Sequence, residues 1–285
     1  MNAASRQRRA QERIESALAA LDMEDVTIAP VAPAMPWSPH PRTFVVSTAR
    51  HGVVKVRLMR HEHRAARVEA LTKELGDERV PALLGRSGAT TVERWVNGSV
   101  ISSSSVKAAH VDAAADILAM LHRFAGIGAE QLPRQRRIGS LIATTQRQLD
   151  ELAATRTISR REASAFARIV DGLPSSALWG VIHTDFGGDN LVVRSDDTVV
   201  SIDNEHLVRG FVDFDLARSW YRWPMPAPSW RRFTRRYQDA ADRDVSADAL
   251  RPWRVVASMT GVRRRYQLGV SIDVALATLR GVLDE

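Results

Sequence analysis

The sequence of 285 residues contains no cysteine, which excludes a disulfide framework and a thiolate zinc site. It also has no apolar stretch close to the roughly 20 residues that a membrane-spanning helix requires. Residues 1–25 lack the uninterrupted apolar segment of a secretory signal peptide. These absences predict a cytoplasmic protein with no membrane partner. With 45% hydrophobic residues, the chain has enough apolar surface for a sizeable core.

Lysine is scarce, because the chain has only Lys55, Lys73 and Lys107, and arginine carries almost all of the formal net charge of +7. A basic chain can attract nucleic acid or other polyanions. However, the sequence has no long run of lysine and arginine, so nucleic acid is not an expected partner. A lysine inside an apolar segment is therefore informative in this chain.

The pattern of apolar residues changes once along the chain. The first part contains an N-terminal helix and mostly strands after it, predicted at 26–32, 42–48, 53–59 and 89–96, with one helix at 61–76. From residue 105 onward amphipathic helices dominate, interrupted by short strands between 178 and 203. The sequence thus predicts an α+β fold of two lobes, a small β-rich lobe over 1–96 and a larger helical lobe over 97–285. We expect the ligand cleft between them.

Polar side chains gather between two apolar runs in VIHTDFGGDNLVV, residues 181–193. This segment contains His183, Asp185 and Asn190, and another carboxylate, Asp203, ends the next apolar run, TVVSID. Phosphoryl transfer requires a carboxylate for the acceptor hydroxyl, oxygen ligands for Mg²⁺ and a lysine for the phosphates. Lys55 within the apolar strand VVKVRL supplies the lysine. A solvent-facing lysine at a sheet edge is the alternative for this residue.

These residues occur in the order and spacing that kinase-type chemistry uses. From the frequencies of the three residue types, the spacing of His183, Asp185 and Asn190 is expected by chance only about 0.01 times. With these motifs the chain resembles the aminoglycoside phosphotransferase and choline kinase-like family, which has the bilobal protein-kinase-like fold. The segment FVDFDLARSW is similar to the stretch after the family's metal-binding aspartate, and by that resemblance Asp215 has a structural role.

The resemblance implies a role for each matching residue. Asp185 is the expected catalytic base, and Asn190 and Asp203 are the expected metal ligands. Lys55 is the expected phosphate-binding lysine, and Glu69, on the helix that follows, is its expected partner.

The segment VERWVNGSVI is similar to the family's hinge, so backbone groups around Glu93, Trp95 and Val96 are expected to contact the adenine. The implied nucleotide is ATP, with GTP not excluded, and the implied metal is Mg²⁺. The implied acceptor is a small hydroxylated molecule, either an antibiotic, as in antibiotic resistance, or a sugar-like or amino-alcohol metabolite.

The chain departs from the family pattern at several positions. The loop over 33–42 contains no glycine, although a backbone cradle for phosphates normally uses one. Thr184 and Asp189 stand where relatives usually have glycine. Glu205 is a candidate auxiliary carboxylate for metal or substrate, and His183 is expected to support the loop. The glycine-free loop leaves open an alternative function, a catalytically silent kinase-like protein that binds a nucleotide or a partner.

Four arginines, Arg231, Arg232, Arg235 and Arg236, lie on one side of a predicted helix. They form either a solvent-exposed face or the border of the acceptor site. In the second case they would repel a polycationic aminoglycoside.

Overall fold

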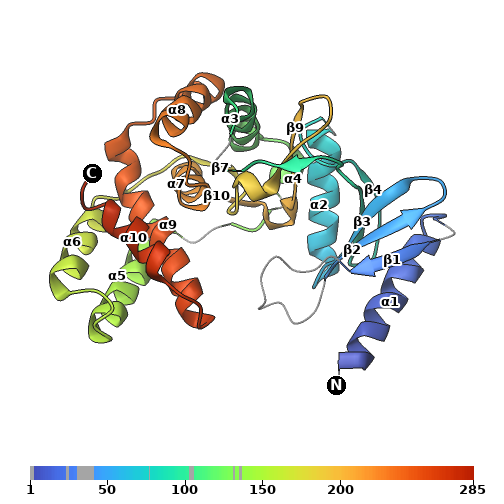
Figure 1. Ribbon diagram of the computed structural model, residues 1–285, viewed down its shortest axis with the longest axis horizontal. Helices are drawn as coiled ribbons and strands as arrows, with labels where there is room; N and C mark the ends of the chain where they lie inside the picture. The colour runs from blue at the N-terminus through green and yellow to red at the C-terminus, as the bar shows by residue number, and fades with distance from the viewer. Residues whose placement is uncertain are drawn as a thin grey trace. The chain divides into compact units, whose positions relative to one another are not determined.

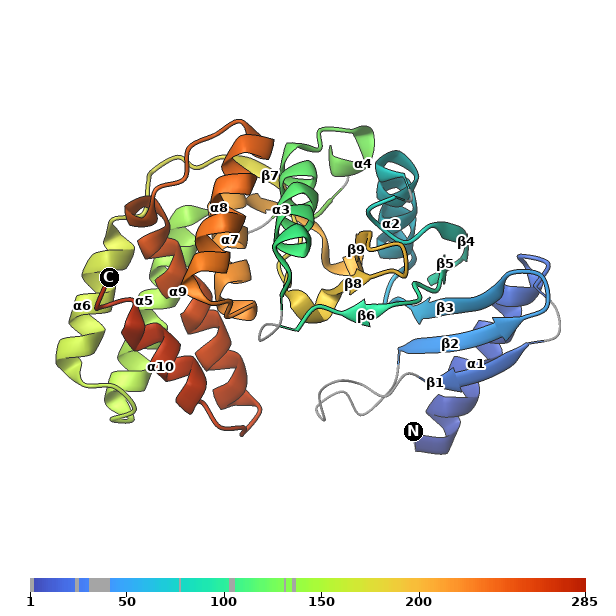
Figure 2. The ribbon, with the colours of Figure 1, turned by 45° about the horizontal axis from the view of Figure 1, so that its top comes forward.

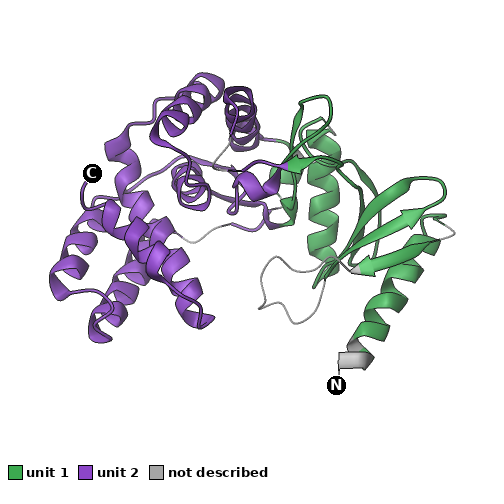
Figure 3. Cartoon of the chain, viewed as in Figure 1, with its two compact units in different colours: residues 1–99, 126–131, 192–205 green, residues 100–125, 132–191, 206–285 purple. Residues whose placement is uncertain are grey.

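The structure, a computed structural model, describes residues 3–23, 26–30, 42–76, 78–102, 106–130, 132–134 and 137–285. The chain forms two compact units (Figure 3). Unit 1 comprises Met1–Ser99, Gly126–Gln131 and Val192–Glu205, and unit 2 comprises Val100–Ala125, Leu132–Leu191 and His206–Glu285. The division predicted from the sequence, 1–96 and 97–285, is continuous, whereas two later segments of the chain fold into unit 1. The glycine-free loop lies, except for Arg42, outside the described residues.

Unit 1 contains a five-stranded antiparallel sheet with the order β1-β2-β3-β5-β4 (Figure 2). Its strands are β1 (Thr27–Pro30), β2 (Thr43–Thr48), β3 (Gly52–Leu58), β4 (Leu83–Ser87) and β5 (Thr90–Arg94). The sequence did not predict β4. All five of its residues are half-buried, so it lacks the alternation of buried and exposed positions that indicates a strand.

One face of this sheet is covered by helix α1 (Ala3–Ala19), whose Ile14 and Leu18 are fully buried. They pack in one apolar cluster with Val54 and Val56 of β3. Successive side chains of a strand point to opposite faces, so Lys55, between these two valines, belongs to the other face.

The rest of unit 1 comprises α2 (Glu62–Leu75), the short α4 (Ile127–Glu130) and a hairpin of β8 (Leu191–Val193) and β9 (Val199–Ser201). These two strands and β6 (Ser99–Val100) form a small sheet of order β6-β8-β9. The Ser201 N–H donates to the Arg79 carbonyl oxygen at 2.9 Å, which attaches the hairpin to the segment after α2.

Unit 2 is mainly helical (Figure 1). Its longer helices are α3 (Ala108–Arg123), α5 (Ile138–Ala154), α6 (Arg160–Asp171), α7 (Val212–Arg222), α8 (Ala227–Ala241), α9 (Ala247–Gln267) and α10 (Asp273–Gly281). The two-stranded sheet of β7 (Trp179–Ile182) and β10 (Val208–Phe211) and the 3₁₀ turns η1 (Gly188–Asn190) and η2 (Asn204–His206) complete the described elements. The predicted α+β class, with strands first and helices later, is confirmed. Within the described ranges, no helix has the length and apolar character needed to span a membrane.

The core of unit 2 is formed by large apolar side chains of α6, α7, α9 and β10. Phe166, Phe211 and Trp253 are at most 2% exposed and belong to one cluster. Figures 1 and 2 show α5, α6, α9 and α10 gathered together, with α3 and α8 side by side. The loop 183–190 follows directly after β7, so the core beneath this strand sets the position of the loop.

Candidate functional site

Lys55 lies in the middle of β3, directly opposite Glu93 of β5 in the strand register. Its side chain is 10% exposed, and its Nζ lies 3.7 Å from Oε2 of Glu93. A buried ammonium group requires oppositely charged or hydrogen-bonding partners. Such burial is inconsistent with the alternative of a solvent-facing lysine at a sheet edge.

Asp203 provides the shorter contact to this lysine, with 2.6 Å between Nζ of Lys55 and Oδ1 of Asp203. Both residues belong to unit 1. The backbone of Asp203 is in the left-handed region, with φ of 59°, which is uncommon for a residue other than glycine. Unusual backbone conformations of this kind cluster at functional sites, because the surrounding structure must hold them.

Arg57 is a second cation at this position that the sequence analysis did not single out. It lies two residues after Lys55 on the same face of β3, with its Nη2 at 3.3 Å from Oδ1 of Asp203. Its Nη1 forms an ion pair with Glu205, whose side chain is only 6% exposed. The two-residue alternation in the segment VVKVRL was the signal that could have identified Arg57. Glu205 is thus engaged with an arginine, and its predicted role as an auxiliary carboxylate stays a prediction.

Glu69 does not pair with Lys55, and this prediction was wrong. Its carboxylate accepts hydrogen bonds from Arg86 of β4 at 2.7 Å and from Lys73, one helical turn further on, at 2.9 Å. These two hydrogen bonds lower the pKa of Glu69. The sequence did not predict β4, so it could not anticipate the arginine that competes for this carboxylate. In this structure Glu93 contacts Lys55 instead.

The predicted adenine-contacting segment begins in β5 and continues beyond its end. The Trp95 N–H donates to the Val53 carbonyl oxygen at 3.3 Å, so this donor already has a partner. Glu93 is buried with its carboxylate near Lys55. Trp95 and Val96 are half-buried. Contact between this segment and an adenine stays a prediction.

In unit 2, the loop after β7 holds Asp185 and Asn190 together. Nδ2 of Asn190 donates to the backbone carbonyl oxygen of Asp185 at 2.8 Å, and the Asn190 N–H donates to Gly187. Asn190 is 9% exposed. Because its amide nitrogen is directed to Asp185, this contact leaves the carbonyl oxygen Oδ1 as the atom available to a cation.

Asp215, in the first turn of α7, anchors the same loop from below. It is fully buried and accepts the backbone N–H groups of His183 and Thr184, both at 2.7 Å. Thr184 has a φ of 65°, the left-handed conformation that glycine adopts most easily, so glycine would also suit the backbone at this position. Asp215 thus attaches the loop after β7 directly to helix α7, which is a structural role.

Two further buried residues extend this network into neighbouring helices. Nε2 of His122 in α3 lies 3.1 Å from Oδ2 of Asp215, and its Nδ1 lies 2.7 Å from the Tyr237 hydroxyl of α8. Because a carboxylate only accepts, Nε2 carries the proton of its contact with Asp215, and Nδ1 shares the other hydrogen bond with the Tyr237 hydroxyl. Burial raises the pKa of Tyr237, which keeps its hydroxyl protonated for this bond. His183 is fully buried, with its ring edge-on to Phe186, and its supporting role stays a prediction.

The side chain of Asp185 faces two arginines of α7. Its Oδ1 lies 2.8 Å from Nε of Arg222 and 3.8 Å from Nη2 of Arg218. Arg222 also reaches Asp189 of the same loop, with Nη2 donating to Oδ2 at 2.8 Å. These contacts could not be predicted from the sequence, because the partners are more than 30 residues apart along the chain.

The model of the phosphotransferase enzyme family matches residues 37–254 of this chain. The chain belongs to this family. It is a small-molecule phosphotransferase, a kinase with a hydroxyl group as acceptor, and the resemblance inferred from the sequence motifs is confirmed.

Solved structures similar to this phosphotransferase include the choline kinase LicA from Streptococcus pneumoniae, at 13% identity and a TM-score of 0.67, covering 96% of this chain and 97% of that chain. A second is the macrolide 2′-phosphotransferase MphH from Brachybacterium faecium, at 13% identity and a TM-score of 0.65, covering 93% and 96%. A third is a choline kinase from Cryptosporidium parvum, at 12% identity and a TM-score of 0.63, covering 91% and 88%. At such identities the likeness shows the shared fold. No curated protein is significantly similar in sequence.

Two of the four arginines on α8 of this phosphotransferase have partners outside the candidate site. Arg232 and Arg236 form two-pronged hydrogen bonds to Asp112 and Asp116 of α3, with the Nε–Oδ1 distances at 2.7 Å and 2.6 Å. These pairs connect α8 to α3. Arg232 and Arg236 therefore belong to a solvent-exposed helix face, the first interpretation of the arginine group, and they do not lie at Asp185.

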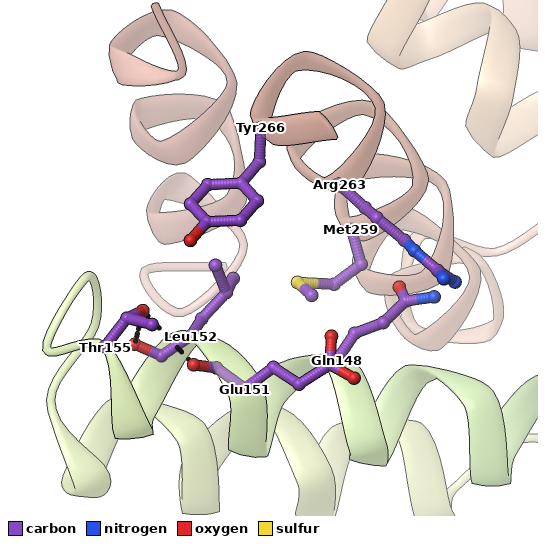
Figure 4. A pocket seen from close by; sticks show the side chains of 7 residues that line it. All are labelled: Gln148, Glu151, Leu152, Thr155, Met259, Arg263 and Tyr266. Carbon is purple, nitrogen blue, oxygen red and sulfur yellow. Dashed lines mark hydrogen bonds between the residues drawn. The ribbon is translucent and has the colours of Figure 1, made fainter. Parts of the chain in front are cut away.

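Unit 2 of the phosphotransferase also has a hollow between α5 and α9, with Leu152 and Met259 as apolar lining and Gln148 and Arg263 as polar lining (Figure 4). Its volume of about 50 Å³ accommodates one or two water molecules. It is too small for a nucleotide, and its lining includes none of the predicted site residues. We therefore do not assign the acceptor to it.

The residues predicted to hold Mg²⁺ have the appropriate chemistry, because Asn190 and Asp203 offer amide and carboxylate oxygen atoms to a hard cation. Within the described ranges, no cluster of three or more histidine, aspartate or glutamate side chains could hold a metal by itself. Binding of Mg²⁺ by Asn190 and Asp203 stays a prediction, and this ion usually takes several of its ligands from phosphate oxygens and water.

Proposed function

We propose that this enzyme transfers the γ-phosphate of ATP to a hydroxyl group of a small molecule, with Mg²⁺ as cofactor and GTP as a possible alternative donor. The observation that carries the proposal is the buried Lys55, whose ammonium group contacts Asp203 at 2.6 Å in unit 1. In the proposed reaction this lysine neutralises phosphate charge and orients the carboxylate that binds the metal.

The proposed roles within the loop of unit 2 follow from its geometry. Asp185 accepts the proton of the acceptor hydroxyl and orients its oxygen toward phosphorus. Asn190, whose amide nitrogen donates to the Asp185 carbonyl oxygen, offers Oδ1 to the metal together with Asp203. When bound, Mg²⁺ neutralises charge on the phosphate oxygens. The contribution of the protein is positioning and charge neutralisation, with no covalent enzyme intermediate.

Related structures support the nucleotide but not one particular acceptor. The solved structures include LicA in complex with AMP and an ADP-bound aminoglycoside phosphotransferase. Other relatives are named for different acceptors, among them choline, ethanolamine and a macrolide. We therefore propose an adenine nucleotide as the donor, and the acceptor class has to be inferred from the contacts of Asp185.

Mass-spectrometric detection of an added phosphate across a library of hydroxylated compounds tests this function. Product should appear with ATP and Mg²⁺ and disappear with a chelator. The variant Asp185→Asn should reduce turnover by about 10²–10⁴-fold. The control variant Asp239→Asn, at an exposed position of α8, should retain it. Nucleotide binding without any product would support the alternative of a catalytically silent kinase-like protein.

A further inference from the structure

Arg222, the last residue of α7, contacts two carboxylates of the loop 183–190, those of Asp185 and Asp189. Its Nε is 2.8 Å from Oδ1 of Asp185, and its Nη2 is 2.8 Å from Oδ2 of Asp189. The side chain of Asp189 is 63% exposed, whereas that of Arg222 is 23% exposed. An ion pair with a partner this exposed contributes little, because water competes for both groups. Arg222 can therefore exchange Asp189 for another anion at small cost.

Arg218, one turn earlier in α7, reinforces the positive charge beside Asp185. Its Nε donates to the backbone carbonyl oxygen of Thr184 at 3.1 Å, and its Nη2 is 3.8 Å from Oδ1 of Asp185. The guanidinium carbon lies 5.6 Å from the centre of the Tyr221 ring. These contacts fix the side chain against the loop, so that its charge stays beside the proposed base.

Two donors of this arginine pair lack a hydrogen-bond acceptor. Nη1 of Arg218 and Nε of Arg222 are buried and make no geometrically satisfactory hydrogen bond within the described ranges, although Nε of Arg222 is close to Asp185 in distance. A buried donor without an acceptor costs free energy, which a ligand oxygen atom can recover. Asp185 and Asp189 each have a nitrogen of Arg222 at 2.8 Å, so an ammonium group that approaches either carboxylate also meets the positive charge of this arginine.

We propose that Arg222, supported by Arg218, selects an anionic acceptor, a hydroxylated molecule with a carboxylate or phosphate group near the reacting hydroxyl. This inference rests on the proposed function of Asp185. The acceptor anion takes the place of Asp189 on Arg222, and its hydroxyl donates to Asp185. An amino alcohol or a polycationic aminoglycoside is disfavoured, because its ammonium group meets two guanidinium groups and no free carboxylate of the loop.

The test compares acceptors of one skeleton but different charge, glycerate, glycerol and aminopropanediol, within a wider library that covers the same three charge classes. Turnover is measured with ATP and Mg²⁺ by ADP release and by the mass of the product. For the wild-type chain, kcat/KM should be highest for anionic acceptors and lowest for cationic ones.

The variant Arg222→Gln should reduce kcat/KM for the best anionic acceptor by about 10- to 100-fold, the equivalent of one hydrogen bond to a charged group. The loss should lie mainly in KM. The same variant uncovers Asp185 and Asp189, so kcat/KM for cationic acceptors should rise. Arg222→Lys should recover part of the preference, since it restores the charge. Arg161→Gln, which removes an equal charge from an exposed position of α6, should have no effect.

Three outcomes would overturn the inference. The first is a wild-type preference for cationic acceptors. The second is an equal loss for all acceptor classes in Arg222→Gln, which would assign the arginine to the transferred phosphoryl group instead. The third is an unchanged charge preference in a folded Arg222→Gln variant. Absence of product with every acceptor would contradict the proposed function itself, and it is therefore distinguishable from these three.

Discussion

Replacing Asp215 with asparagine tests whether this buried carboxylate holds the loop 183–190 in place. Asp215 is fully buried and accepts hydrogen bonds from the N–H groups of His183 and Thr184 at 2.7 Å and from His122 at 3.1 Å. Asparagine has the same shape but replaces one acceptor oxygen by an NH₂ donor. Both carboxylate oxygens accept a hydrogen bond, so in either orientation of the amide a donor faces another donor.

The magnitude follows from these contacts. A hydrogen bond to a charged group contributes about 1.5–3 kcal/mol, and a buried donor left without an acceptor costs about 1–3 kcal/mol. The bonds that remain also weaken, because their acceptor is no longer charged. We expect the free energy of unfolding of unit 2 to fall by about 3–5 kcal/mol, the range for removing one partner of a buried charged network.

Urea unfolding followed by tryptophan fluorescence measures this change. Unit 2 contains the buried tryptophans Trp223 and Trp253, which report on its core. Asp239→Asn, at an exposed position of α8, is the matched control. Turnover of Asp215→Asn should also fall, because the loop backbone at His183 and Thr184 loses its attachment. A change in unfolding free energy below about 0.5 kcal/mol, the range of ordinary surface substitutions, would refute this reasoning.

The pH dependence gives a second readout of the same carboxylate. Burial acts to raise the pKa of Asp215, but the hydrogen bond and charge of His122 and the hydrogen bond from the His183 N–H outweigh it, and the net pKa lies below the ordinary value of 3.8. A group whose folded pKa is lowered contributes stability above its unfolded pKa and loses it as pH falls through the folded value. The Asp215→Asn variant should therefore lack this part of the acid sensitivity below about pH 4.

Three other substitutions give distinct outcomes. Asp185→Asn should leave nucleotide affinity nearly unchanged, measured by calorimetry, while turnover falls by about 10²–10⁴-fold; retained turnover would show that the base is another group. Gly188→Ala should destabilise unit 2 by about 1–3 kcal/mol in urea unfolding, because an added Cβ would lie 2.3 Å from the Ile101 carbonyl oxygen, and a neutral result would contradict this packing. Ser159→Ala should cost about 1 kcal/mol by removing the capping box of α6. In the wild-type chain, hydrogen bonds from Ser159 and Arg280 lower the pKa of Glu162 to about 2, so the contribution of this carboxylate to stability should be lost as pH falls from 4.5 toward 2. A cost of Ser159→Ala that does not change with pH would count against this cap.

The family and the fold class could be predicted from the sequence, because both depend on local patterns. Apolar alternation marks a strand, and apolar residues at three- and four-residue spacing mark a helix, without reference to the rest of the chain. The spacing of His183, Asp185 and Asn190 is likewise a property of one short loop. The rarity of lysine drew attention to Lys55. Its position between Val54 and Val56, which pack in the apolar cluster with α1, places Lys55 on the opposite face of the sheet.

The partners of these residues were decided by the tertiary structure alone. Glu69 is nearer to Lys55 in sequence than Glu93 is, yet the register of β3 and β5 brings Glu93 opposite this lysine. The arginines of α7 reach Asp185 because that helix packs beneath the loop, a long-range contact that no periodicity encodes. Charge pairing depends on distances of a few ångströms between segments far apart in the chain, and these distances are set by core packing, register and loop path together.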